Sequence, residues 1–275
     1  MSRQQEFKVP PIRQAYSIDF ADYGRDVVGY WFEMNHEYEG HRTFQEHLDI
    51  YLDSYNWRKI IQPGTTIVDI GAHSGDTTVI MQAMSGGTVL AVECNPEIRP
   101  WLEFACHMNR HLGRSVVASE AVSTHSGMLT FADHGNQMCN GGLVGHSWSV
   151  ETKRSVVVGK QIQVQSITLP GLLLKYLTED EISSIDLIKL DTEGHDFEIL
   201  ASSYDTIDAL RPKLFVEWFN HFSAEDVARM FAVIKDLGYV ALYPKTFELA
   251  SPDQQSEDLL LIHQTKLDAF LKAVQ

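Results

Sequence analysis

The stretch TTIVDIGAHSGDTTVIMQAM, residues 65 to 84, decides the fold. Its first residues are β-branched and apolar, which is typical of a short buried strand. Gly71 and Gly75 follow in a G-x-x-x-G turn, and helix-forming residues come after it. The stretch therefore predicts a strand, a glycine turn and a helix, with Asp69 close to the end of the strand.

Similar units follow along the chain. TVLAVECN (88–95) predicts a second strand, PEIRPWLEFACHMNR (96–110) its helix, and SVVASEAVS (115–123) a third strand. Two such units side by side indicate a parallel sheet with right-handed crossovers. Later segments predict the rest of the sheet and one more helix: strands in 185–191, 211–219, 239–244 and 258–264, and a helix over 224–238.

Residues 127 to 168 break this alternation. MLTFAD (128–133) and QIQVQSITL (161–169) indicate antiparallel strands, and a stretch rich in Gly and Asn lies between them. We interpret this segment as an antiparallel insertion near the functional site. The expected fold is α/β, a doubly wound, Rossmann-like sheet over residues 61–275.

Residues 1–60 are expected to form an N-terminal cap or lid. An apolar stripe at helical spacing predicts a helix from about residue 42 to the QPG at 62–64; the stripe contains Phe44, Leu48, Tyr51, Leu52 and Tyr55. Tyr30, Trp31 and Phe32 have two interpretations. They could stack on an acceptor molecule, or they could belong to the core.

Charge and cysteine content exclude several classes of protein. The chain has 22 Lys and Arg against 37 Asp and Glu, a formal charge of −15, which disfavours a nucleic-acid substrate. Its three cysteines form no CxxC pair and suggest neither a disulfide framework nor a zinc site. No export signal and no apolar run long enough for a membrane span is present, so we expect a cytoplasmic protein without a membrane partner.

The glycine turn favours a nucleotide without a pyrophosphate. A dinucleotide fold prefers G-x-G-x-x-G, but His73 stands where the middle glycine would be. Glu93 ends the next strand, where an acid can accept hydrogen bonds from ribose hydroxyls. Adenosine that carries an amino acid in place of phosphate is S-adenosylmethionine. Alternatively, Asp69 caps the helix, the glycines only turn the chain and Glu93 is solvated.

The chain resembles the FkbM-type S-adenosylmethionine-dependent methyltransferases, which act mostly on small molecules and sugars. The resemblance covers roughly residues 61 to 220, and its most specific part is the K-x-D-x-E-G block. It departs from the family at His73, where Asn is frequent, and at Ser202, where Gly is frequent. The motifs that carry it, in order, are TIVDIGAHSGDTT (66–78), VLAVECNPE (89–97), EAVSTHSGMLTF (120–131), IDLIKLDTEGHDFEIL (185–200) and PKLFVEW (212–218).

The resemblance implies a set of cofactor contacts. Glu93 would hold the ribose, Asn95 would lie beside it, and the turn at Glu120 and Ala121 would meet the adenine. The residues implied at the methionine end are Asp69, Gly71, His73 and Gly75.

Acids gather where the strand 185–191 ends. Ligands of such sheets bind at the carboxyl ends of the strands, so acids there can orient an acceptor or take its proton. Lys189 and Asp191 share one face of the strand, and this lysine needs a buried partner, either Asp191 or Asp69. Lys189 would then position Asp191. The other candidates for the acceptor side are Glu193, His195 and Glu217.

Other interpretations of these acids stay open. Thr192 could cap a helix whose first turn carries Glu193, Asp196 and Glu198. A divalent metal on Asp191, Glu193 and Glu217 is permitted, but no ligand spacing requires one. The histidines of HEYEGH, His36 and His41, miss the zinc-protease spacing and fit a polar loop better.

The sequence therefore predicts a methyltransferase that acts on a hydroxyl of a small molecule or sugar. Transfer to an amine needs the same positioning and stays an alternative. A nucleotide-binding scaffold would not need the acid cluster, and an NAD-linked oxidoreductase is disfavoured by His73.

Overall fold

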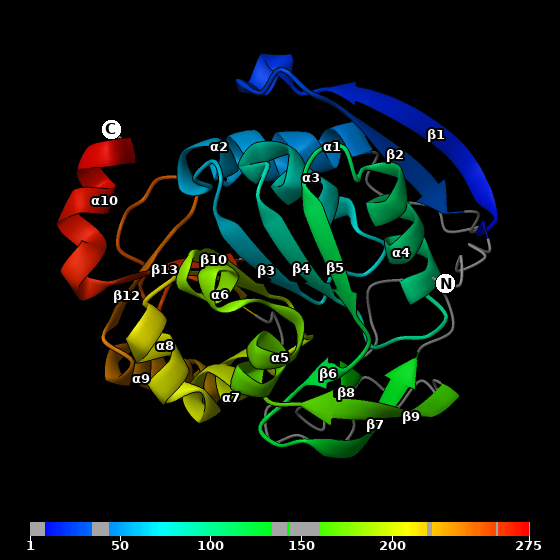
Figure 1. Ribbon diagram of the computed structural model, residues 1–275. Helices are drawn as coiled ribbons and strands as arrows, with labels where there is room; N and C mark the ends of the chain where they lie inside the picture. Colours follow the sequence, from blue (N-terminus) through cyan, green and yellow to red (C-terminus); the bar gives the residue numbers. More distant parts are fainter. Residues whose placement is uncertain are drawn as a thin grey trace.

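The computed structural model describes residues 9–34, 44–133, 142–143, 160–218, 222–256 and 258–274. Within them, one sheet has the strand order β12–β13–β11–β10–β3–β4–β5 (Figure 1). β13 is antiparallel to both of its neighbours, whereas the other pairs are parallel. The strands are β3 (Thr66–Ile70), β4 (Thr88–Val92), β5 (Arg114–Ala118), β10 (Ile185–Leu190), β11 (Lys213–Glu217), β12 (Tyr239–Leu242) and β13 (Asp258–His263).

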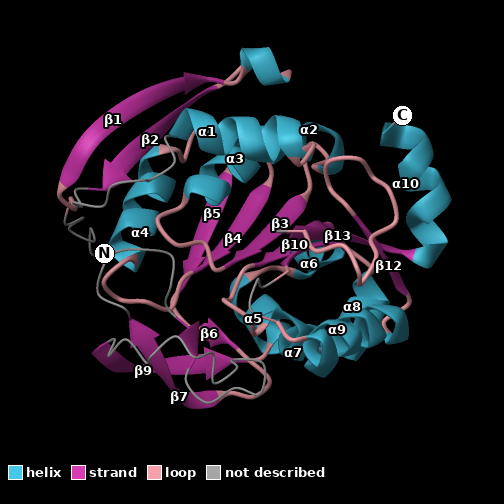
Figure 2. Cartoon of the chain, turned by 180° about the vertical axis from the view of Figure 1, so that it is seen from behind, coloured by secondary structure: helices cyan, strands magenta, loops and turns pink. Residues whose placement is uncertain are grey.

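Helices cover both faces of this sheet, as the two opposite views show (Figures 1 and 2). The predicted doubly wound architecture is confirmed. One face carries α2 (Trp57–Ile60), α3 (Asp76–Ser85), α4 (Arg99–Met108) and α10 (Leu267–Val274). The other carries α5 (Leu169–Tyr176), α6 (Glu179–Ser183), α7 (Asp196–Ser202), α8 (Tyr204–Leu210) and α9 (Ala224–Asp236).

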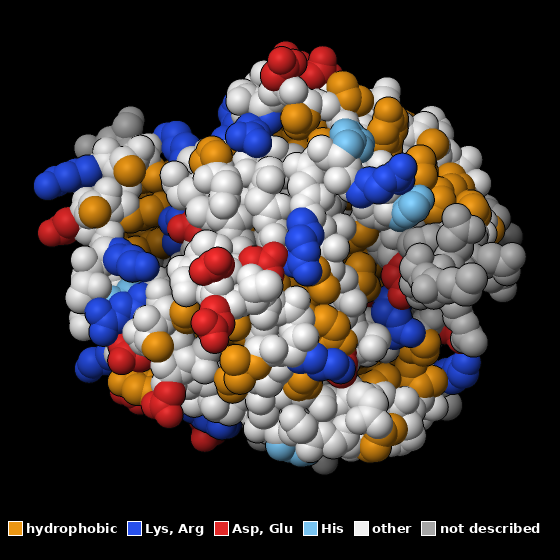
Figure 3. All heavy atoms as spheres, in the orientation of Figure 1, with side chains coloured by type: hydrophobic (Ala, Val, Ile, Leu, Met, Phe, Trp, Pro, Cys, Tyr) orange, Lys and Arg blue, Asp and Glu red, His pale blue; other side chains and the backbone are white. Residues whose placement is uncertain are grey.

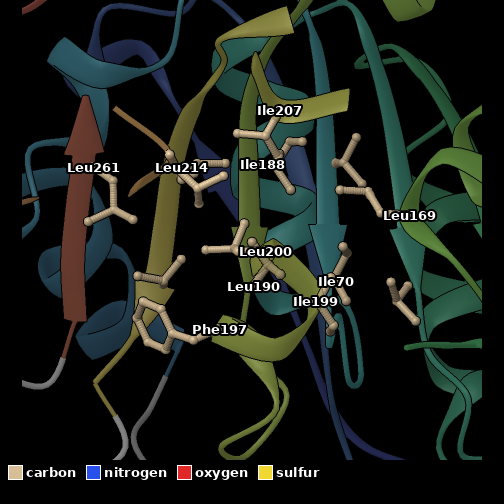
Figure 4. Close-up of a cluster of buried hydrophobic side chains, with 14 of the residues drawn as sticks. Ile70, Leu169, Ile188, Leu190, Phe197, Ile199, Leu200, Ile207, Leu214 and Leu261 are labelled. Carbon is tan, nitrogen blue, oxygen red and sulfur yellow. The ribbon is translucent and has the colours of Figure 1, made fainter. Parts of the chain in front are cut away.

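Each face of the sheet has its own apolar core. Ile70, Ile188, Leu190 and Leu214 point to the core under α5–α9 (Figure 4). Leu187 points to the core under α2, α3 and α10. Side chains alternate along a strand, so Lys189 and Asp191, two and four positions after Leu187, lie on the same side of the sheet as Leu187. Polar residues at the strand ends on that side therefore meet in one place.

The N-terminal segment forms a hairpin that the sequence did not predict. β1 (Ile12–Asp19) pairs with β2 (Val28–Met34), and the 3-10 turn η1 (Ala21–Tyr23) joins them. Trp31 and Phe32 of β2 are buried, and the Phe32 ring lies 4.7 Å from that of Phe104 in α4. These two aromatics therefore belong to the core. Figure 3 shows hydrophobic side chains on the surface over this hairpin. Tyr30 of β2 is exposed.

The helix predicted from residue 42 is broken. It consists of α1 (Phe44–Leu48), the π-helical η2 (Asp49–Ser54) and α2. Asn56, with φ 57°, adopts a left-handed backbone between η2 and α2, which ends one helical run and starts the next. The side chain of Asn56 donates to the carbonyl of Pro244, a tertiary contact that local spacing could not predict.

The predicted third strand also divides. β5 stays in the main sheet, whereas β6 (Ala121–Val122) leaves it and pairs with the insertion. The insertion strands are β7 (Gly127–Asp133), β8 (Gly142–Leu143) and β9 (Lys160–Ile167). β7 and β9 are antiparallel, as predicted, and they form a second sheet below the first in Figure 1. Gly142 lies against Glu193, so the insertion reaches the acid cluster.

Candidate active site

Three strands bring carboxylates to one edge of the main sheet. Leu190 pairs with Val216, so Asp191 and Glu217 follow side by side at the ends of β10 and β11. Glu217 in turn pairs with Asp258, the first residue of the antiparallel β13. Neighbouring strands lie about 4.8 Å apart, so these acids form a row. The sequence predicted Asp191 and Glu217 but missed Asp258, whose place depends on a long-range antiparallel pairing.

The glycine turn closes this row on the side of β3. Gly71 has φ 78°, and a Cβ atom there would lie 1.9 Å from the carbonyl oxygen of Asp191. Gly75 has φ 94°, and its Cβ would lie 3.0 Å from Leu102 in α4. His73 between them is also left-handed, with φ 47°. Both glycines are therefore required by packing and backbone conformation, and Gly71 sets how closely the turn approaches Asp191.

Lys189 links two acids beneath the turn. Its Nζ lies 3.1 Å from Asp191 Oδ2 and 3.5 Å from Asp69 Oδ1, so both predicted partners are confirmed. Burial alone would lower the pKa of Lys189, but the carboxylates of Asp191 and Asp69 outweigh it and hold that pKa well above its usual value. Lys189 is therefore a fixed cation and no proton acceptor.

Asp69 is committed to contacts within the protein. It is fully buried, and its Oδ2 accepts hydrogen bonds from the hydroxyls of Thr77 (2.8 Å) and Thr78 (2.6 Å) in α3. These donors are side-chain hydroxyls and not backbone N–H groups, and the N-cap of α3 is Gly75, so the capping alternative for Asp69 is not what these contacts show. Asp69 acts on the site through Lys189 and α3, and a direct contact with a ligand stays a prediction.

Glu93 is held at the end of β4 by two backbone groups. Its carboxylate accepts hydrogen bonds from the N–H groups of His73 (3.0 Å) and Asn95 (2.7 Å). Burial raises the pKa of Glu93 to about 7, although these two N–H groups oppose that shift. The carboxylate is therefore tied to the glycine turn and buried, in contrast to the solvated alternative.

Glu120 and Ala121 lie where β5 passes into β6. Lys175 and Tyr176 of α5 both donate to the Glu120 carboxylate. Burial would raise the pKa of Glu120, but the hydrogen bonds from Lys175 and Tyr176 outweigh it and lower that pKa. The Ala121 side chain packs in a small core with Phe131. The contact of this turn with adenine stays a prediction, because the Glu120 carboxylate already has partners in α5.

His195 is held by contacts on both ring nitrogens. The residue is buried, its Nε2 lies 3.1 Å from the Ser123 hydroxyl, and its Nδ1 lies 2.5 Å from Glu198. Both ring nitrogens thus contact protein groups, and a role of His195 on the acceptor side stays a prediction. The contact with Ser123 spans 72 residues and left no local signal in the sequence.

The loop after β10 also differs from the predicted helix start. Glu193 (φ 58°) and Gly194 (φ 98°) are left-handed, so α7 begins only at Asp196. Thr192 does not cap the helix with its side chain; instead its N–H donates to Asp196 Oδ1 at 3.3 Å. This geometry holds the buried Asp196 next to the end of β10, where the sequence had placed an ordinary helix-start acid.

Tyr51 of η2 is another residue near the site that the sequence did not predict there, because its spacing assigned it only to an apolar stripe. Its ring packs on Trp57, with ring centroids 4.4 Å apart. Burial raises the pKa of its hydroxyl, and the acids Asp76, Asp258, Asp191 and Asp69 raise it further. The hydroxyl of Tyr51 therefore lies near the acid row.

Neither a cluster of metal-binding side chains nor a membrane-spanning helix occurs among the described residues. No group of three or more His, Cys, Asp or Glu side chains among them could hold a metal ion, so the acid row supplies no ready metal site there. No helix in this part of the chain is long and apolar enough to cross a membrane. His36, His41 and Cys139 lie outside the described residues, while Cys94 and Cys106 are free thiols.

The strand order, the glycine turn after β3 and the acid at the end of β4 define a class I S-adenosylmethionine methyltransferase fold. Within that class the chain belongs to the FkbM methyltransferase family, because the model of the methyltransferase FkbM domain matches residues 69–241. Comparison with curated proteins gave no significant match.

Solved structures resemble the chain at low identity. The methyltransferase FkbM of Methylobacillus flagellatus is 11% identical with a TM-score of 0.44, over 80% of this chain and 52% of that one. The chain thus spans about half the length of that relative. A Pyrococcus furiosus methyltransferase has a TM-score of 0.41 at 11% identity, over 88% of this chain and 90% of that one. Aeropyrum pernix fibrillarin, solved with S-adenosylmethionine, has a TM-score of 0.38 at 12% identity. The match covers 92% of this chain and 94% of that one.

Proposed function

We propose that this chain transfers a methyl group from S-adenosylmethionine to a hydroxyl group of a small molecule or sugar, with Asp191 as the base that orients the acceptor. The observation that carries this proposal is the position of Asp191. It follows β10 at the carboxyl edge of the sheet, its side chain is 40% exposed, and the buried Lys189 fixes one of its oxygens. An acid that is both anchored and accessible suits a proton acceptor.

The residues of the glycine turn fit the cofactor. A carboxylate oxygen can accept more than one hydrogen bond, so Glu93 can hold its two backbone N–H groups and still accept from ribose hydroxyls. The Thr192 hydroxyl beside Asp191 is buried and has no hydrogen-bond partner within the described part of the chain, which leaves a donor for a ligand at this edge. Gly71, His73 and Gly75 would line the methionine end.

The chemistry asks little of the protein beyond positioning. S-adenosylmethionine supplies a methyl group on a sulfonium that needs no activation. The chain must hold the acceptor oxygen in line with that methyl and receive its proton. As the bond from the acceptor oxygen to the methyl carbon forms, the bond from that carbon to the sulfonium sulfur would break and S-adenosylhomocysteine would leave. The hydroxyl proton would pass to the Asp191 carboxylate. Lys189 keeps Asp191 oriented.

Exchange of Asp191 tests the proposal. Calorimetry with S-adenosylhomocysteine should show unchanged cofactor affinity for Asp191→Asn, whereas turnover in a screen of sugars and small hydroxylated molecules should fall by about 10²–10⁴-fold. Asp236→Asn, an exposed acid at the end of α9, is the matched control and should keep full turnover. An Asp191→Asn enzyme with wild-type turnover would rule out Asp191 as the base.

A further inference from the structure

Glu217 of the acid row and Asp196 beside it each have a buried carboxyl oxygen without a partner among the described residues. Glu217 Oε2 and Asp196 Oδ2 are shielded from solvent, and neither has a hydrogen-bond partner in the described part of the chain. Asp196 itself is 1% exposed. Buried polar atoms normally find a partner, because leaving one unsatisfied costs its full desolvation. Two such oxygens at the carboxyl edge of the sheet point to a ligand that donates to them.

Both orphaned oxygens lie at the row. Glu217 shares the sheet face of Phe215, which pairs with Lys189, and it stands beside Asp191 and Asp258. Asp196 is tied to the residue after Asp191 through the N–H of Thr192. The acids reach this place from three directions, namely the ends of two strands and the start of α7.

Acidic side chains crowd the row. Lys189, the cation nearest to it, is already shared between Asp191 and Asp69. Burial raises the pKa of Glu217 well above its usual value, and Asp191, Glu193, Asp196 and Asp258 raise it further. Burial and then Asp191 raise the pKa of Asp196 as well. Such crowded acids favour a ligand that brings positive charge and several N–H donors.

We infer that the acceptor carries a protonated amino group, which binds between Glu217, Asp196 and Asp191, so that the substrate class is an amino sugar or amino alcohol. This inference rests on the proposed methyl transfer and names its substrate class. An ammonium group has three donors and one positive charge, which match the two orphaned oxygens and the Asp191 carboxylate. The amino group anchors the acceptor, and the methyl group goes to a neighbouring hydroxyl.

A matched pair of small molecules tests the inference directly. Ethanolammonium and ethylene glycol are of similar size and differ in one ammonium group. Carbon-13 labelling of the glutamate carboxyls follows the titration of Glu217 by NMR, with and without S-adenosylhomocysteine, and Glu217→Gln assigns its signal. Because an ammonium group favours the ionised carboxylate, saturating ethanolammonium should lower the titration midpoint of Glu217 by about one pH unit or more.

The controls separate a specific site from general effects. Ethylene glycol, and sodium chloride at the same ionic strength, should leave the midpoint of Glu217 unchanged. Asp196→Asn should reduce the ethanolammonium effect, whereas Glu179→Asn, an exposed acid on α6, should not. An equal shift with sodium chloride or ethylene glycol, no shift with ethanolammonium, or a larger shift with magnesium chloride would each overturn the inference.

The experiment also distinguishes the inference from the proposed function. If S-adenosylhomocysteine binds and Glu217 ignores ethanolammonium, the amino-bearing substrate class is wrong and the methyltransferase proposal stands. If S-adenosylhomocysteine does not bind, the proposed function fails, and the ethanolammonium titration of the free protein still decides whether the row is an ammonium site.

Discussion

At the scale of single residues, Lys189 is the cation that offsets the carboxylates of Asp69 and Asp191. It is buried between Asp69 and Asp191, and Asp69 is fully buried with it. Lys189→Met would leave the Asp69 carboxylate in the core without a cation, which costs about 3–5 kcal/mol for a broken buried ion pair. Urea denaturation should show this loss in the free energy of unfolding.

A second exchange checks the cause of that loss. Asp69→Asn combined with Lys189→Met removes the stranded charge, so the double variant should be more stable than Lys189→Met alone. If Lys189→Met lowers the free energy of unfolding by less than about 1 kcal/mol, the contact of Lys189 with Asp69 contributes no more than a surface ion pair. The stranded Asp69 charge would then not explain the stability of the site.

Glu93 gives the site a predicted pH dependence. Its pKa is raised to about 7, so the carboxylate is half protonated near neutral pH and ionised above it. The ionised form accepts more hydrogen bonds from ribose hydroxyls, so affinity for S-adenosylhomocysteine should rise by up to about tenfold between pH 6 and pH 8. Calorimetry across this range measures the step, which should be absent in Glu93→Gln. A step that persists in that variant belongs to another group.

The sequence predicted some of these residues and missed others for physical reasons. Alternation along β10 was enough to pair Lys189 with Asp69 or Asp191, because it depends on one strand. Asp258 enters through the pairing of β13 with β11, and His195 is occupied by Ser123 from a distant segment. Contacts of that kind are set by the tertiary fold and leave no pattern along the chain.

At the scale of elements, the turn after β3 sets the distance between two strands. Gly71→Ala would place a Cβ 1.9 Å from the Asp191 carbonyl oxygen, in addition to the cost of a left-handed backbone. Gly64→Ala is a matched control, since Gly64 has φ 79° and open space around its Cβ position. We expect Gly64→Ala to cost about 1–2 kcal/mol and Gly71→Ala clearly more.

The same pair of variants separates stability from function. Displacement of Asp191 should remove turnover in Gly71→Ala, whereas Gly64→Ala should keep it at a temperature where both are folded. Equal unfolding free energies of the two variants in urea would show that the close approach to Asp191 is easily relieved.

Elements were predictable where one strand or helix carries its own signal. The main strands and the antiparallel β7–β9 pair follow from apolar runs and alternation. The breaks do not, because Asn56 is held by the carbonyl of Pro244 and β6 is drawn out of the third strand by pairing with β9. The sequence did not predict the hairpin β1–β2 for a related reason, since its adjacent aromatics fit a core but also permit a lid.

At the scale of the whole molecule, the N-terminal segment shares a core with the sheet. Ile18, Phe20 and Trp31 belong to the same apolar cluster as Ile67 of β3 and Val89 of β4. A separate cap would instead have its own core and its own unfolding transition. The predicted boundary near residue 60 can therefore be tested through the cooperativity of unfolding.

Phe20→Ala should destabilise the whole domain. Phe20 is fully buried, and its truncation leaves a cavity worth about 3–5 kcal/mol. Trp218 lies in the core on the opposite face of the sheet. The urea unfolding transition of that core should therefore show the same loss of unfolding free energy. Val28→Ala, an exposed residue on the same hairpin, should change it by less than about 0.5 kcal/mol. An unchanged transition in the Trp218 core, together with a separate early one, would instead establish residues 1–60 as an independent cap.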